Sequence, residues 1–129
     1  MKRFTNYLAT TLLAISCVAS VCAEIKDIDC QQKLNTILND KKRPYTVVKF
    51  WKEECQPCDD LAPHFEAVAD DLGDQVNFVA IEGPSVISRH YKIKGFPTTL
   101  YFKNGKRMPK EGTRNVNRLE DDIRAAFGL

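Results

Sequence analysis

The chain has 129 residues, a length that suits a single domain with one hydrophobic core. It carries 19 lysine and arginine residues against 17 aspartate and glutamate residues, and two of the basic ones are Lys2 and Arg3. Beyond residue 3 the charges balance, so no basic excess remains for binding nucleic acid or anionic lipid.

The first 23 residues have the pattern of a secretory signal peptide. Lys2 and Arg3 are followed by an uncharged, largely apolar stretch over residues 7–21. Small residues at Val21 and Ala23 then occupy the positions that a signal peptidase recognises. We therefore expect residues 1–23 to be removed.

Residues 24–129 are then expected to form one exported domain, most naturally in a bacterial periplasm. An uncleaved membrane anchor is the first alternative, but the apolar stretch of 15 residues is shorter than the ~20 needed to span a bilayer. Cys17 leaves lipoprotein processing as a second alternative. After cleavage we expect no stable membrane insertion.

The first expected element is a helix. Asp29 and Gln32 have the spacing of a capping box, which predicts a helix start at Asp29. Four residues at helical spacing form its apolar face: Cys30, Leu34, Ile37 and Leu38. Cys30 is therefore expected to be a small buried hydrophobe, with a third redox thiol as the alternative.

The middle of the chain predicts two strands and two helices. β-Branched and aromatic residues predict a strand over Tyr45–Trp51. An apolar stripe predicts a helix over Cys58–Leu72. A second strand is expected over Val76–Ile81, and a short helix over Val86–Tyr91 after a break at Gly83-Pro84.

The last third predicts a hairpin and a helix. A strand over Thr98–Phe102 leads into Asn104-Gly105, a turn signal because the favoured two-residue turn needs positive φ at both positions. The returning strand is expected to end near Pro109. Asn117 and Glu120 have capping-box spacing and predict the start of a C-terminal helix.

This order of elements restricts the fold. The first strand, helix and second strand require a parallel pair with a right-handed crossover, whereas the hairpin adds antiparallel strands. The predicted class is α/β, with a mixed central β-sheet flanked by helices on both faces.

Cys55 and Cys58 lie where the first strand gives way to a helix, with two residues between them. Unpaired N–H groups and the helix dipole favour a thiolate there, and a thiolate is the species that attacks a disulfide. Cys55 would attack a substrate disulfide and Cys58 would resolve the mixed disulfide, with Pro57 stiffening the loop. The pattern predicts a redox-active couple.

Two other uses of this pair are less well supported. A structural zinc site would need two more ligands, for which the remaining candidates are His64, His90 and Cys30. We expect neither a metal nor another cofactor, and we expect both histidines to be surface residues and not catalytic bases. A purely structural disulfide would close so short a loop that it would restrain little chain entropy.

Two segments of the sequence resemble the thioredoxin family. They are "VVKFWKEECQPCDDLAP", with a proline five residues after the second cysteine, and "YKIKGFPTTLYFKNGK". Gly112 and the amphipathic C-terminal segment also fit, so the resemblance covers nearly all of residues 24–129. It implies the thioredoxin fold and a protein thiol–disulfide oxidoreductase whose partners are disulfide-containing proteins.

The resemblance also implies roles for individual residues. Pro97 would be cis and lie against the cysteine pair, and the backbone of Phe96 would pair with an extended substrate segment. Trp51 would pack beneath the active-site loop, Cys55 would be the exposed nucleophile, and Cys58 would be shielded. The substrate-binding residues predicted are Trp51, Pro57, Phe96 and Pro97.

Three positions depart from the family pattern. Glu54 replaces the usual tryptophan before the first cysteine, and Gln56 replaces the usual glycine after it. Lys49 replaces a buried aspartate that is thought to help deprotonate the resolving cysteine. We expect Lys49 to extend toward solvent or to pair with a nearby acid such as Glu53. Loss of its proton on burial and stabilisation of a thiolate are the alternatives.

Carboxylates surround the cysteine pair at Glu53, Glu54, Asp59 and Asp60. Like-charge repulsion should raise the pKa of Cys55 and make the dithiol more reducing. The alternative is that they are ordinary solvated acids at a helix start.

The expected function is that of an exported, monomeric oxidoreductase that reduces or isomerises disulfides of extracytoplasmic proteins. A membrane or soluble thiol electron donor would re-reduce it, because an exporting compartment is oxidising. A disulfide-forming oxidase and a thioredoxin-fold binding or chaperone module are the alternatives. A cytochrome-maturation reductase would need an insertion for which Leu72–Val76 leaves no room.

Overall fold

The computed structural model describes residues 24–112 and 115–129, so the predicted signal peptide over residues 1–23 lies outside the described residues. The described residues form a five-stranded sheet in the order β1-β3-β2-β4-β5. Its strands are β1 (Lys26–Asp27), β2 (Tyr45–Trp51), β3 (Val76–Glu82), β4 (Thr98–Lys103) and β5 (Lys106–Glu111). β3 runs parallel to β1 and β2, whereas β4 is antiparallel to β2 and to β5. The predicted mixed sheet is confirmed.

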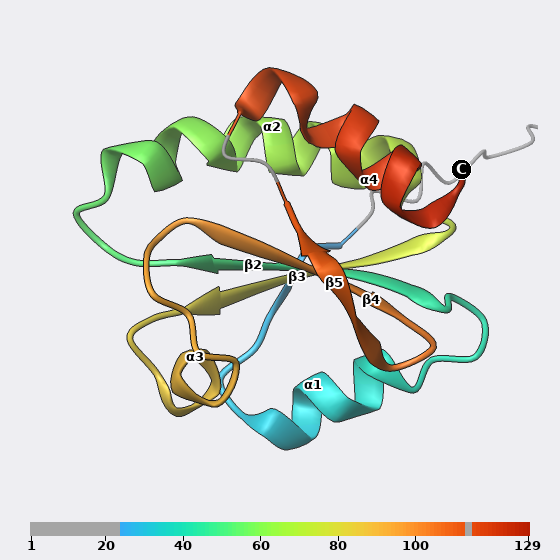
Figure 1. Cartoon of the computed structure of the whole chain (residues 1–129), viewed down its shortest axis with the longest axis horizontal. Coiled ribbons are helices and arrows are strands. Elements are labelled where there is room, and N and C mark those ends of the chain that lie inside the picture. The colour runs from blue at the N-terminus through green and yellow to red at the C-terminus, as the bar shows by residue number, and fades with distance from the viewer. Residues whose placement is uncertain (1–23, 113–114) are drawn as a thin grey trace, which may run out of the picture.

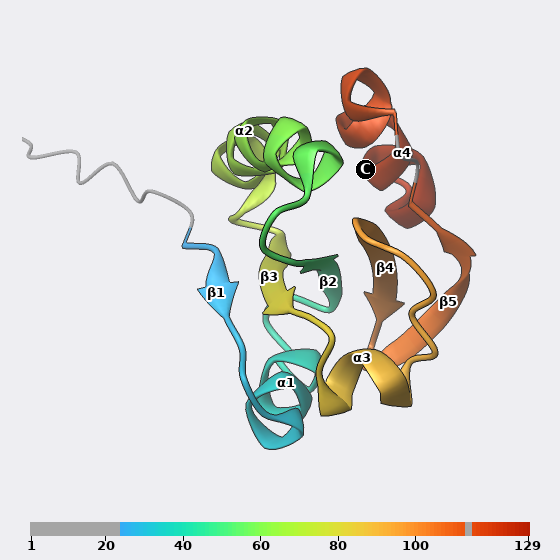
Figure 2. The ribbon, with the colours of Figure 1, turned by 90° about the vertical axis from the view of Figure 1, so that its left-hand side faces the viewer.

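Helices cover both faces of this sheet (Figures 1 and 2). They are α1 (Gln31–Leu38), α2 (Gln56–Leu72), α3 (Val86–His90) and α4 (Leu119–Phe127), with a 3₁₀ turn over Val116–Arg118. α2 and α4 lie on one face, and α1 and α3 lie on the other. Within the described residues, none of these helices combines the length and the apolar character that a membrane span requires.

The core consists of two apolar layers separated by the sheet. Val47 on β2 packs with Phe65 of α2 and Ile123 of α4, whereas the next residue, Val48, packs with Leu34 of α1 and Ile87 of α3. Because helices cover both faces, β2 and β3 are almost continuously buried and show no polar alternation. This arrangement fixes the ends of β2 and β3, between which the cysteine pair lies.

The start of α1 differs from the prediction. Cys30 is the N-cap residue and makes no side-chain capping bond. The Asp29 carboxylate instead accepts a 2.7 Å hydrogen bond from Lys33, one helical turn away. The predicted capping box is therefore wrong, and Cys30 at the cap is half-buried and not a core residue.

The start of α4 also differs. Asn115 accepts a 3.1 Å hydrogen bond from the N–H of Asn117, which places the cap two residues earlier and begins a 3₁₀ turn. α4 follows at Leu119, and Glu120 binds Arg124 at 2.8 Å instead of closing a capping box. The prediction that Asn117 caps the helix is wrong, because Asn117 lies inside the 3₁₀ turn and Asn115 supplies the capping side chain.

The hairpin follows its local signal. Asn104 and Gly105 have φ values of 51° and 76°, as the predicted two-residue turn requires. β5 extends two residues beyond Pro109, to Glu111. A proline is tolerated there because β5 is an edge strand with one side free of ladder bonds.

Candidate redox site

The cysteine pair lies at the N-terminus of α2. Cys55 is the extended N-cap residue, Cys58 lies in the first helical turn, and a disulfide joins them. The N–H groups of Cys58 and Asp59 both donate to the carbonyl of Cys55, at 2.9 and 3.0 Å. Both sulfurs therefore lie at the positive end of a 17-residue helix, which favours thiolates in the reduced form.

Both cysteines are almost fully covered. Cys55 is 6% exposed and Cys58 is 4% exposed. The expectation of an exposed Cys55 beside a shielded Cys58 is therefore not met in this oxidised form, because the bond between the two sulfurs gives them a shared environment.

The loop before Cys55 contains a residue in the left-handed region. Glu54 has φ of 51°, which is uncommon for a side chain without the freedom of glycine. The four acids predicted around the pair, Glu53, Glu54, Asp59 and Asp60, are all exposed. Asp60 accepts a 2.8 Å hydrogen bond from Gln56. Their influence on the cysteines stays a prediction.

Gly83, which sequence reasoning treated only as a strand breaker, contacts the ring of Phe96 and the backbone of Trp51. A Cβ atom on Gly83 would lie 2.5 Å from the ring of Phe96, so that ring lies directly on the glycine. The Gly83 N–H donates to the carbonyl of Trp51 at 2.7 Å. The Phe96–Pro97 and Gly83–Pro84 peptide bonds are both cis, and Pro97 is buried.

The same sheet, helix order and cysteine pair occur in a known family. The model of the family described as Thioredoxin matches residues 28–125. The chain belongs to the thioredoxin family.

Relatives with curated names agree with this family assignment. Thioredoxin of Neurospora crassa is 29% identical over 108 residues, which cover 79% of this chain and 83% of that protein. Protein disulfide-isomerase 1 of Caenorhabditis elegans is 24% identical over 121 residues. This match covers 90% of the chain but only 25% of the isomerase. The solved structure of Malassezia sympodialis thioredoxin has the same fold, with a TM-score of 0.71 at 24% identity over 80% of this chain and 90% of that one.

Members of the thioredoxin family are disulfide oxidoreductases that act on disulfide-containing proteins. This chain has the family's fold and its cysteine pair, Cys55 and Cys58, in disulfide form. The protein is therefore a thiol–disulfide oxidoreductase. Pro57 lies between the cysteines on the exposed surface.

Lys49 lies in the core, although the sequence suggested that it extends toward solvent. It is 8% exposed, and its Nζ atom lies 4.7 Å from the centroid of the Phe65 ring. Burial lowers the pKa of Lys49, while the charges of Glu66 and Asp27 oppose that shift. The expected extension into solvent is wrong, and the acids whose charges act on Lys49 are Glu66 and Asp27, not Glu53.

Sheet register explains why the charge of Asp27 acts on Lys49 in addition to that of Glu66. Asp27 pairs with Ala80 on β3, and Ala80 pairs with Lys49 on β2, so the three residues form one row across the sheet. Residues in such a row point to the same face of the sheet, and Ala80, with its small side chain, lies between Lys49 and Asp27. Sequence reasoning missed Asp27 because the two-residue strand β1 carries no pattern of its own.

The remaining candidates take no part in this site. His64 and His90 are exposed, and Cys30 is a half-buried free thiol at the start of α1. Among the described residues, no group of three or more histidine, cysteine, aspartate or glutamate side chains is placed to hold a metal ion. The chemistry assigned to this thioredoxin-family site therefore rests on the two cysteines.

Proposed function

We propose that this protein is an exported reductant or isomerase for disulfides of extracytoplasmic proteins. The observation that carries the proposal is the Cys55–Cys58 disulfide at the N-terminus of α2. The pattern of residues 1–23 supports export. In an oxidising compartment the dithiol form must be regenerated, so we infer a membrane or soluble thiol electron donor.

The reaction begins with the dithiol form. The thiolate of Cys55 attacks one sulfur of a substrate disulfide, forming a mixed disulfide and releasing the other substrate sulfur as a thiolate. The thiolate of Cys58 then attacks the Cys55 sulfur, which forms the Cys55–Cys58 bond and releases the second substrate thiolate. Two electrons pass to the substrate, and the donor dithiol later returns two to the cysteine pair.

The acids around the pair support the reducing direction. Glu53, Glu54, Asp59 and Asp60 disfavour additional negative charge and so disfavour the dithiolate relative to the disulfide. A couple of this kind should have a reduction potential near thioredoxin's, about −270 mV, and not near the about −120 mV of a strong oxidase. Titration against a dithiol couple of known potential measures this directly.

Insulin-disulfide reduction by a dithiol donor tests the activity. We expect turnover by the wild type, loss of turnover in Cys55→Ser, and accumulation of a mixed disulfide in Cys58→Ser. Cys30→Ser is the matched control, because it removes a thiol outside the site and should retain wild-type turnover. A potential more than about 100 mV above thioredoxin's would favour the oxidase instead.

A binding or chaperone module is the second candidate, favoured by the buried Lys49 at the place of the family's aspartate. It predicts that Cys55→Ser leaves the protein's main activity intact. Suppression of aggregation of a reduced client, measured for the wild type and Cys55→Ser, would separate a module of this kind from the oxidoreductase.

Export is tested by intact mass. The full chain expressed in a bacterial host should appear in the periplasmic fraction with Glu24 as its first residue. A lipid-modified Cys17 would instead identify lipoprotein processing.

A further inference from the structure

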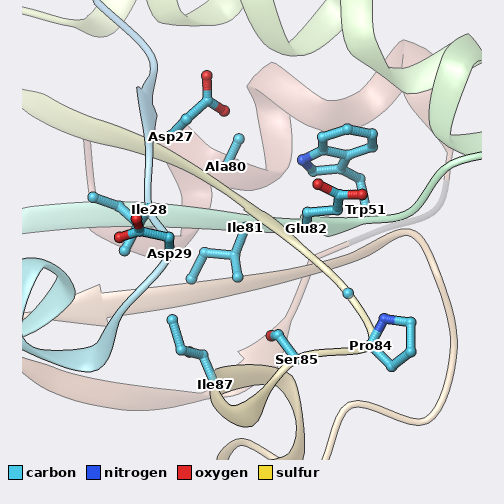
Figure 3. Close-up of a pocket in the computed structure, with 11 residues that line it drawn as sticks. Asp27, Ile28, Asp29, Trp51, Ala80, Ile81, Glu82, Pro84, Ser85 and Ile87 are labelled. Atoms are coloured by element: carbon cyan, nitrogen blue, oxygen red, sulfur yellow. The ribbon is translucent and has the colours of Figure 1, made fainter.

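A groove of about 640 Å³ runs along the outer edge of β3 and reaches Trp51, the last residue of β2 (Figure 3). We call it the β3-edge groove. Apolar side chains line it, among them Ile28, Ile81 and Ile87, and the indole of Trp51 lies at one end. A hollow of this size with an apolar lining is large enough to take several side chains of an extended segment.

The groove exists because β1 is shorter than β3. The last residue of β1, Asp27, pairs with Ala80, and the Ile28 N–H donates to the Ala80 carbonyl at 3.0 Å. β3 continues for two more residues to Glu82, where only its other edge is paired, with Trp51 of β2. The outer edge of the last part of β3 is therefore left open to an added strand.

Three carboxylates surround this groove: Asp27, Asp29 and Glu82. Asp29 is paired with Lys33 at 2.7 Å, and Asp27 interacts at longer range with the buried Lys49. Within the described residues, Glu82 has no cation within ion-pair distance, and no lysine or arginine lines the groove. The negative charge of Glu82 therefore complements a basic segment and repels an acidic one.

The groove reaches the end of β2, the strand that leads to the redox site. Trp51 lines the groove, and its carbonyl binds the N–H of Gly83, on which the ring of Phe96 lies. Val86 follows the groove residue Ser85 and is 72% exposed, which extends the apolar surface beyond the groove. Trp51 lies four residues before Cys55, so it connects the groove with the loop that leads to the cysteine pair.

We propose that the β3-edge groove binds an extended segment of the protein substrate that carries a lysine or arginine next to an apolar side chain. The basic group pairs with Glu82, and the apolar side chain enters among Ile28, Ile81 and Ile87. As a substrate-docking surface, the groove rests on the proposed function as a disulfide reductant or isomerase. Binding itself can nevertheless be measured without any disulfide chemistry.

Trp51 makes that measurement direct, because it is the chain's only tryptophan and it lines the groove. The purified oxidised protein is titrated with a short cysteine-free peptide containing Arg-Leu, and separately with the same peptide containing Glu-Leu, while Trp51 fluorescence is followed. We expect saturable binding of the Arg-Leu peptide, at least about tenfold tighter than the Glu-Leu peptide and weakened by salt.

Three variants locate the binding. Glu82→Lys should abolish the preference for the basic peptide, and Glu82→Gln should reduce it. Asp74→Lys makes the same charge change on an exposed residue before β3, at the opposite end of the strand, and should leave the preference intact. Glu53→Lys changes the redox-site acids instead of the groove and should have a smaller effect than Glu82→Lys.

Several results would overturn the proposal. They are an absence of saturable binding, a preference that survives in Glu82→Lys, and an equal loss in Glu53→Lys, which would assign binding to the redox-site acids. A concentration-dependent dimer that Glu82→Lys disrupts would identify a second copy of the chain as the occupant. Peptide binding without insulin reduction would reject the proposed reductant function and leave the groove as a peptide site.

Discussion

The ammonium group of Lys49 lies 4.7 Å from the centre of the Phe65 ring, inside the layer of the core that α2 covers. A cation at this distance from an aromatic face is attracted to it, by about 0.5–2 kcal/mol depending on its desolvation. Burial nevertheless lowers the pKa of Lys49, with Glu66 and Asp27 opposing the shift. Lys49 is therefore held in place by its contact with Phe65, while folding disfavours its charged form.

Replacing Lys49 by methionine should therefore stabilise the protein at neutral pH. Methionine keeps the length of the side chain and its contact with Phe65 but has no charge to desolvate. We expect the unfolding free energy at pH 7 to rise by about 1 kcal/mol, a usual size for a point-mutant effect. Urea denaturation measures it, and a loss of stability would show that the cation–π contact outweighs the cost of burial.

The stability of the wild type should also depend on alkaline pH through Lys49. The unfolded chain keeps this proton up to the ordinary pKa of 10.5, whereas the folded protein releases it at a lower pH. Between these two pKa values the unfolded state holds more protons, so the unfolding free energy contributed by Lys49 rises with pH. Denaturation of wild type and Lys49→Met at a series of pH values from 7 to about 10.5 isolates this rise. If the unfolding free energies of the two proteins change with pH in the same way, the prediction is contradicted.

Gly83 should be intolerant of a side chain because of Phe96. A Cβ atom there would lie 2.5 Å from the ring, so Gly83→Ala must displace it, at a cost of about 1–3 kcal/mol. In a Phe96→Ala background the same change should cost much less. A double-mutant cycle by chemical denaturation measures this coupling, and additive effects would show that the ring is not what excludes the methyl group.

Tyr101→Phe should be neutral or stabilising. The Tyr101 side chain is completely buried, and among the described residues its hydroxyl has no hydrogen-bond partner. Burial raises the pKa of this hydroxyl, and the charge of Asp122 adds to the shift. Removing an unsatisfied group avoids part of a desolvation cost of about 1–3 kcal/mol. Tyr101→Ala, the control that removes the ring, should lose about 3–5 kcal/mol.

Neutralising the acids around the cysteine pair should make the couple more oxidising. The variant carries Glu53→Gln, Glu54→Gln, Asp59→Asn and Asp60→Asn. These carboxylates disfavour thiolates at the N-terminus of α2, so their loss should raise the reduction potential by about 15–30 mV. For a two-electron couple, about 30 mV corresponds to a tenfold change in the exchange equilibrium constant. High salt should shrink the difference.

The control for that variant is the set of exposed acids at the far end of α2, neutralised as Asp70→Asn, Asp71→Asn and Asp74→Asn. It should leave the reduction potential within a few millivolts of the wild type, on the order of the precision of such titrations. An equal shift in both variants would assign the effect to net charge and not to position.

Local patterns predicted much of this structure. β2, the body of α2 and the Asn104-Gly105 hairpin appear where the sequence places them, because strand propensity, helical spacing and turn φ angles act over neighbouring residues. The position of Cys55 and Cys58 at a strand-to-helix junction follows from the same local signals.

Helix caps were less predictable. Asp29 and Glu120 each have a basic residue one turn ahead, and the carboxylates bind those side chains in place of the backbone. Capping-box spacing is therefore ambiguous wherever a lysine or arginine follows at i+4.

By itself, the sequence determined the two cysteines, the order of the elements around them and the family they indicate, since each depends on residues close together in the chain. Tertiary structure alone decided that Phe96 lies on Gly83 and that Lys49 is buried in one row with Asp27. It also decided that β3 extends beyond the end of β1 and leaves an open groove. These relationships join residues far apart in sequence, and they arise only when strands pair and the sheet brings their ends together.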